Sequence, residues 1–100
     1  MVRQIVWTSK AESQLKAVLE YYNTRNGSTK YSKKILTAVK HLQILIQHNP
    51  LVGHRTNIPF EYECRVVHLK HFNIYYSMVD THKVVVLLFR DTRSGLNIEP

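Results

Sequence analysis

Apolar residues in the first half of the chain recur at three- and four-residue steps, which is the period of an amphipathic helix. One such stripe predicts a helix from Lys10 to Tyr22 or Arg25, and another predicts a longer helix over residues 29–47. Asn26-Gly27 separates them, and glycine readily takes the left-handed conformation with which many helices end. Because this connection is short, we expect the two helices to form an antiparallel hairpin.

Local signals mark the ends of these helices. Ser9 and Glu12 have the spacing of a capping box, in which each side chain satisfies a backbone amide of the first turn. Asn49-Pro50 ends the second helix, because the residue before a proline disfavours helical angles. The stretch 51–59 holds turn-forming residues among polar ones, and it is expected to be an irregular loop.

β-Branched and aromatic residues predict four strands, one before the helices and three after them. They cover residues 2–7, 62–69, 72–79 and 83–90. Two short links join the last three strands as hairpins. The order β-α-α-β-β-β predicts one α+β domain over residues 1–100, with the helical hairpin on one face of a mainly antiparallel, four-stranded sheet. The polar tail, residues 91–100, is expected to be mobile.

Face alternation assigns the strand residues to two sides of the sheet. Tyr76 shares a face with Phe72 and Ile74 and is expected in the core, beneath the helices. Tyr75 then points to the open face, where a tyrosine could stack on a base or pack against a protein partner. Cys64 is expected to be a small buried strand residue rather than a nucleophile.

The net charge of the chain indicates what kind of partner it attracts. The chain has 14 Lys and Arg against 7 Asp and Glu, a net charge of +7. A field of that size favours polyanions or an acidic partner protein. The lysines of the second helix are read as a solvated face in preference to the alternative, a nucleic-acid groove.

The remaining composition excludes several classes of protein. The chain has a single cysteine, so no disulfide can form within it, and a reducing cytoplasm is the expected location. The six histidines have no metal-ligand spacing, and we expect neither a metal nor another cofactor. No apolar run approaches the length of a membrane span, and no membrane contact is expected.

Five local motifs occur in an order that resembles the RelE/ParE toxin family. They are Trp7-Thr8 before a helix with Ala11 and Leu15; Leu45 or Ile46 followed by Pro50 and Gly53; Arg65 at the start of a strand; Phe72-Asn73-Ile74-Tyr75-Tyr76; and Phe89-Arg90-Asp91-Thr92-Arg93. Each motif is weak when taken singly, and their order and spacing carry the resemblance, which covers nearly the whole chain.

The resemblance implies a toxin of a type II toxin–antitoxin system that is neutralised by a cognate antitoxin. Two targets stay open. RelE-like members cleave mRNA in the ribosomal A site without a metal, whereas ParE-like members poison DNA gyrase. A third reading is a non-toxic relic that binds only its antitoxin.

The resemblance also implies candidate site residues. If the chain is RelE-like, the candidate catalytic residues are Arg65 and Arg93, with His68 or His71 as acid or base. Target-binding candidates, for nucleic acid or for a protein target, are Arg65, Lys70, Tyr75, Arg90 and Arg93.

Two departures from the family pattern favour the ParE-like reading. Catalytic members carry an arginine where this chain has Asn73, and an amide cannot neutralise a phosphate in the transition state. Nuclease members also commonly place a histidine or tyrosine just after the last strand, where this chain has 91–95 without either residue. Asp91 in that stretch is expected to be a structural ion-pair partner.

Overall fold

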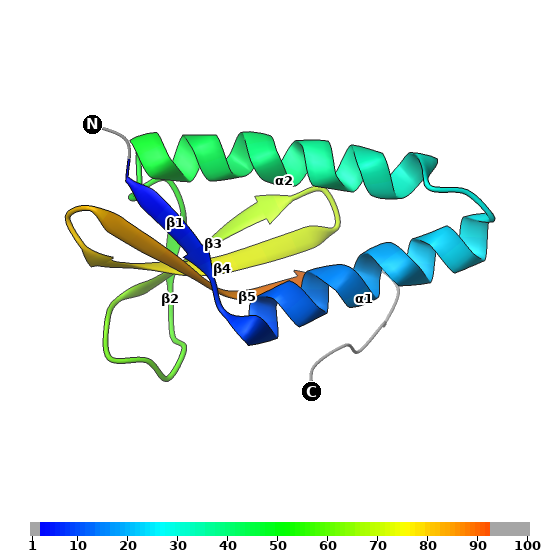
Figure 1. Cartoon of the computed structure of the whole chain (residues 1–100). Coiled ribbons are helices and arrows are strands. Elements are labelled where there is room, and N and C mark those ends of the chain that lie inside the picture. Colours follow the sequence, from blue (N-terminus) through cyan, green and yellow to red (C-terminus); the bar gives the residue numbers. More distant parts are fainter. Residues whose placement is uncertain (1–2, 93–100) are drawn as a thin grey trace.

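The computed structural model describes residues 3–92, which form two helices packed against one sheet (Figure 1). The helices α1 (Ser9–Asn26) and α2 (Lys30–His48) make an antiparallel hairpin, as predicted. The strands are β1 (Gln4–Trp7), β2 (His54–Thr56), β3 (Cys64–Leu69), β4 (Phe72–Asp80) and β5 (Lys83–Asp91). The predicted α+β class is therefore confirmed.

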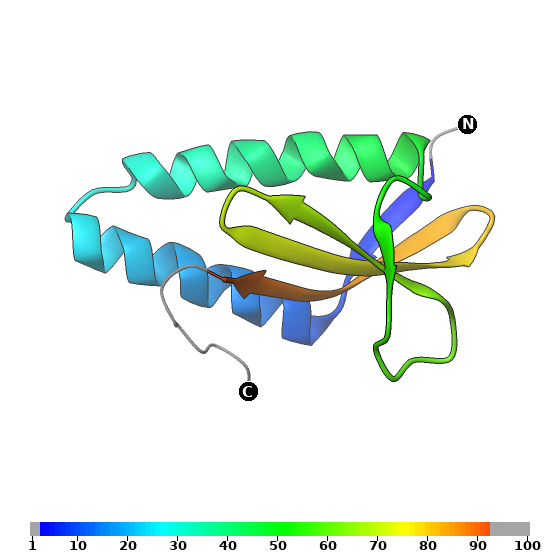
Figure 2. The ribbon, with the colours of Figure 1, turned by 180° about the vertical axis from the view of Figure 1, so that it is seen from behind.

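The strands follow the order β1-β5-β4-β3-β2 across the sheet. β1 is parallel to β5, and the other neighbouring pairs are antiparallel. Over the described residues the sheet has five strands, so the prediction of four was wrong. The extra strand β2 lies in the segment expected to be a loop, and its three residues are too few to show an alternating pattern. Viewed from the opposite side, β2 and the loop after it lie in front of the sheet (Figure 2).

The start of α1 differs from the prediction by one residue. Thr8, rather than Ser9, is the N-cap, and its hydroxyl accepts a hydrogen bond from the Ala11 amide at 3.1 Å. The capping box of Ser9 and Glu12 is therefore wrong. The Thr8 hydroxyl also lies 3.3 Å from the Leu87 carbonyl oxygen of β5, to which it donates. This second bond fixes Thr8 against the sheet and so sets where the helix begins.

The ends of the other elements lie close to the predictions. Gly27 adopts a φ of 65°, the left-handed conformation expected after α1. Asn49 closes α2, and its amide donates to the Leu45 carbonyl. Asp91 is the buried last residue of β5, so this residue does not belong to the predicted tail. Residues 93–100, which include Arg93, lie outside the described part of the chain, as does the predicted strand residue Val2.

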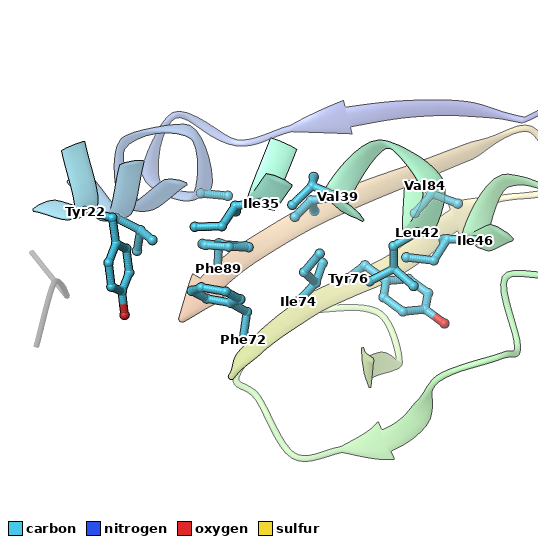
Figure 3. Close-up of a cluster of buried hydrophobic side chains, with 13 residues drawn as sticks. Tyr22, Ile35, Val39, Leu42, Ile46, Phe72, Ile74, Tyr76, Val84 and Phe89 are labelled. Carbon is cyan, nitrogen blue, oxygen red and sulfur yellow. The ribbon is translucent and has the colours of Figure 1, made fainter. Parts of the chain in front are cut away.

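The core lies between the helical hairpin and one face of the sheet, as Figure 3 shows. Phe72, Ile74 and Tyr76 of β4 point into it, which confirms the predicted assignment of faces. Phe72 and Phe89 stack with ring centroids 5.4 Å apart. The helices contribute apolar side chains from both α1 and α2: Ala11, Val18, Tyr22, Ile35, Val39, Leu42 and Ile46.

A polar contact lies inside this core, close to an irregularity in the pairing of β4 with β5. Tyr75 pairs with Leu88 and Tyr76 with Val86, so Leu87 is an extra residue in β5. Close to this bulge the amide of Phe89 donates to the side-chain oxygen of Gln14 at 2.9 Å. Gln14 comes from α1 and is 1% exposed. The Gln14 side chain of α1 thus accepts a hydrogen bond that a backbone carbonyl of a neighbouring strand would otherwise accept.

Candidate target-binding face

The sheet face away from the helices carries a row of polar and aromatic side chains, which we call the open-face row. It consists of His68 on β3, Asn73 and Tyr75 on β4, and Arg90 on β5. Asn73 is the register partner of both His68 and Arg90, so the row crosses three neighbouring strands. Local alternation brings these residues to one face, and strand pairing brings them together.

Contacts join the members of the open-face row. His68 Nδ1 lies 2.6 Å from the Asn73 side-chain oxygen, which requires the proton to be on Nδ1 if that oxygen accepts. The Asn73 side-chain amide donates to the Tyr75 hydroxyl at 3.4 Å. The Arg90 guanidinium carbon lies 5.5 Å from the centre of the Tyr75 ring, within cation–π range. The row therefore offers a positive charge and a ring in one place.

The loop after β2 covers part of the open face. Residues 56–60 line a hollow of about 530 Å³ together with Tyr75, Leu88 and Arg90. Phe60 in this loop is 41% exposed, which is high for a phenylalanine. An arginine, a tyrosine and an exposed phenylalanine around one hollow have the composition of protein-binding hot spots.

Cys64 is buried on the same side of the sheet, as expected from the sequence. Burial raises the pKa of its thiol, and the nearby Glu63 carboxylate raises it further. A thiol held in its neutral form is a poor nucleophile. Cys64 therefore has a packing role.

Arg65 points to the other face of β3, because its register partner is the core residue Tyr76. Its guanidinium donates to the carbonyl oxygens of Gly53 at 2.7 Å and Leu51 at 3.3 Å, and it lies 2.9 Å from a Glu63 oxygen. The Arg65 side chain is only 19% exposed. Arg65 and His68, both candidates for one catalytic site, thus lie on opposite faces of the same strand.

Tyr76 binds the same segment, residues 50–53, from the core. Its hydroxyl donates to the Pro50 carbonyl at 2.8 Å and accepts from the Gly53 amide at 2.9 Å. Burial raises the pKa of the Tyr76 phenol, although the Gly53 hydrogen bond and the charge of Arg65 act in the opposite direction. The Pro-x-x-Gly motif therefore has a structural explanation: it is the segment that Tyr76 and Arg65 bind.

The other candidates lie at the β3–β4 turn or beyond. Lys70 and His71 form this exposed turn, and Lys70 has a φ of 53°. Lys70 lines a hollow with residues of α2 and does not join the open-face row. The His71 carbonyl accepts from the Thr92 amide and hydroxyl, at 2.7 and 3.0 Å. Arg93 lies outside the described residues.

Asp91 is buried and accepts a hydrogen bond from the Tyr22 hydroxyl at 2.7 Å. This contact ties the end of β5 to α1. Asp91 is thus a structural residue, which the Tyr22 hydroxyl helps to hold in place.

Sequence reasoning missed two residues of the open face. Asn73 was noted only as a missing arginine, yet it links His68 to Tyr75. His54 of β2 has its ring centre 6.3 Å from that of His68. The link that Asn73 makes becomes visible only with the strand register, and His54 was missed because β2 itself was not recognised. No group of three or more His, Cys, Asp or Glu side chains in the described part of the chain could hold a metal ion.

Neither described helix is long and apolar enough to cross a membrane.

The fold and the order of the motifs define the RelE/ParE class that the sequence suggested. The family model described as "ParE toxin of type II toxin-antitoxin system, parDE" matches residues 5–94, so the chain belongs to the ParE toxin family. No curated protein matches the chain.

Among solved structures, the fold is similar to a chain of the "Chromosomal ParDE TA system from P. aeruginosa". The TM-score is 0.71 at 17% sequence identity, over 92% of this chain and 98% of that chain. At that identity the likeness shows the fold alone.

Proposed function

We propose that this ParE-family toxin inhibits DNA gyrase by binding it, in the cytoplasm, and that a cognate antitoxin neutralises it. The observation that carries the choice of binding over RNA cleavage is the separation of Arg65 from His68. A ribonuclease site needs its cation and its acid or base on one scissile phosphate. Here Arg65 is bound to Gly53 and Leu51, on the opposite face of β3 from His68.

The open-face row serves as the recognition surface in this proposal. Tyr75 and Arg90 supply a ring and a charge beside the 530 Å³ hollow, and tyrosine and arginine are enriched among residues that dominate binding energies. His68 and Asn73 extend the row with groups that can donate and accept hydrogen bonds. A protein target fits this mixture, which needs no reacting group.

An antitoxin partner is supported by the family and by charge. The similar solved structure is described as a toxin–antitoxin system, and the chain carries a net charge of +7. An acidic antitoxin would be attracted by that charge and would associate rapidly. A short acidic gene beside the toxin gene would be the corresponding genomic observation.

The test is a supercoiling reaction with purified gyrase, relaxed plasmid and increasing amounts of this protein. We expect loss of supercoiling and accumulation of linear plasmid. Arg90→Ala and Tyr75→Ala should each weaken inhibition at least about tenfold, as expected for central binding residues. Arg25→Ala is the matched control, because Arg25 is an exposed arginine at the far end of α1.

A translation extract with a defined mRNA distinguishes the alternatives. Codon-phased new 5′ ends would assign a RelE-like ribonuclease and contradict the gyrase proposal. Inactivity in both reactions, together with tight binding to the antitoxin, would identify a non-toxic relic.

A further inference from the structure

A second surface of the molecule is basic and separate from the open-face row. Lys33, Lys34 and His41 of α2 line a hollow of about 390 Å³ together with Lys70 of the β3–β4 turn. The remaining lining residues are Thr37 and Ala38. Figures 1 and 2 both show this turn beside α2. We call Lys33, Lys34, His41 and Lys70 the α2 basic patch.

No acidic residue of α2 balances this patch. The whole of α2 contains four lysines and two histidines, with no aspartate or glutamate. Among residues 3–92, none of the three lysines of the patch forms an ion pair. Three unpaired ammonium groups around one hollow repel one another, so the sequence maintains a locally unfavourable arrangement.

Lys70 adds a second cost at the same place. Its φ of 53° lies in the left-handed region, where glycine is favoured and a residue with a Cβ is strained. No hydrogen bond or ion pair of the Lys70 side chain within the described residues accounts for a lysine there. The two-residue turn that joins β3 to β4 accounts for the positive φ itself, but not for the choice of a lysine, which places its charge beside the lysines of α2.

We infer that the α2 basic patch binds the phosphodiester backbone of a nucleic acid, in addition to the protein target proposed for the open face. Lysines act as point charges toward phosphates, and contacts of this kind need no apolar anchor. An acidic protein segment would need such an anchor, and the lining of this hollow includes no large apolar side chain. The patch would thus recognise charge without reading sequence.

The inference does not depend on gyrase, because binding is measured with nucleic acid alone. Fluorescence anisotropy with a labelled 20-base-pair DNA of arbitrary sequence gives the affinity at several salt concentrations. The triple variant Lys33→Gln, Lys34→Gln, Lys70→Gln should bind at least about tenfold more weakly at 0.1 M salt. The slope of log affinity against log salt should become shallower by about 2–3, since each phosphate contact contributes roughly 0.9.

The matched control is Lys16→Gln, Lys40→Gln, Lys83→Gln, which removes the same charge from positions outside the patch. It should retain most of the affinity. Equal losses in the two triple variants would assign binding to net charge and overturn the patch. Absence of binding by the unmodified protein, or binding of a poly-glutamate peptide instead of DNA, would overturn it as well. A parallel titration with hairpin RNA shows which nucleic acid is the preferred source of the phosphates.

Lys70 provides an internal check. Lys70→Gly relieves the backbone strain, so it should raise the Tm while it weakens DNA binding. Lys70→Arg should leave DNA binding nearly unchanged. A purely structural Lys70 would give no loss of DNA binding in the glycine variant, and that result would remove Lys70 from the patch.

Discussion

The two faces of this sheet differ in how completely their side chains are used. On the helix-covered face Phe72, Tyr76 and Phe89 are at most 2% exposed, and the hydroxyl of Tyr76 has partners on both sides. On the open face Tyr75 and Arg90 are only half-buried, and both line the hollow beside the loop after β2. The comparison indicates that the covered face supplies stability, whereas the open face leaves partly exposed the side chains that we propose for target binding.

The strongest test of this comparison replaces one aromatic residue on each face with alanine and compares the losses of stability. Phe89→Ala should lower the free energy of unfolding by about 3–5 kcal/mol, because Phe89 is fully buried between Phe72 and Trp7. Tyr75→Ala should lower it by only about 1 kcal/mol while it reduces inhibition of the target. Urea denaturation measures both values. If the Tyr75 variant were as unstable as the Phe89 variant, the contrast between a stabilising covered face and an open face would be contradicted.

A smaller effect is expected where the covered face meets the segment after α2. A Cβ on Gly53 would lie 2.8 Å from both the Val66 carbonyl oxygen and the Tyr76 hydroxyl oxygen. Gly53→Ala should therefore cost about 3 kcal/mol. Gly27→Ala is the control, since nothing lies within 4 Å and only its φ of 65° opposes alanine, at about 1 kcal/mol. Equal melting temperatures for the two variants would show that the Gly53 segment can move aside.

The next largest loss of stability is expected at the hydrogen bond between Gln14 and the Phe89 amide inside the core. Gln14→Leu leaves the buried amide of Phe89 without its acceptor, at a cost of about 2 kcal/mol. Ser13→Ala, one position earlier on the exposed side of α1, should change stability by less than about 0.5 kcal/mol. Hydrogen exchange at the Phe89 amide is the specific measurement, and unchanged protection in Gln14→Leu would mean that another acceptor replaces the glutamine.

The smallest effect concerns the start of α1. Thr8→Ala removes the N-cap and should cost about 1 kcal/mol, roughly 4–8 °C in Tm for a domain of this size. Ser9→Ala should be nearly neutral. If Ser9→Ala lowered the Tm more than Thr8→Ala, that result would support the capping box of Ser9 and Glu12 that the sequence suggested.

Much of the fold could be predicted from periodicity. The two long helices and the last three strands have patterns that extend over several turns or pairs, and their ends agree within a few residues. The face assignment of Tyr75 and Tyr76 also followed from alternation, and it is confirmed. These features depend on local sequence, which periodicity reports directly.

The features that were missed depend on tertiary contacts. β2 exists because three residues pair with β3, and Thr8 replaces Ser9 as the cap because it also reaches Leu87. Buried Gln14 has no signal in the sequence, since its acceptor is needed only beside the bulge in β5. Likewise, the carbonyl partners of Arg65 in the segment after α2 could not be foreseen from the sequence.

The parallel pairing of β1 with β5 has a consequence for biosynthesis. β1 is translated before its sheet neighbour β5, and both helices and three strands are made between them. Until then the core face of β1 has no strand beside it, and contacts between such distant segments form slowly. Incomplete chains therefore lack an assembled sheet. A premature stop codon or stalled synthesis should release harmless fragments, and the cell has the whole interval of synthesis in which to supply a neutralising partner.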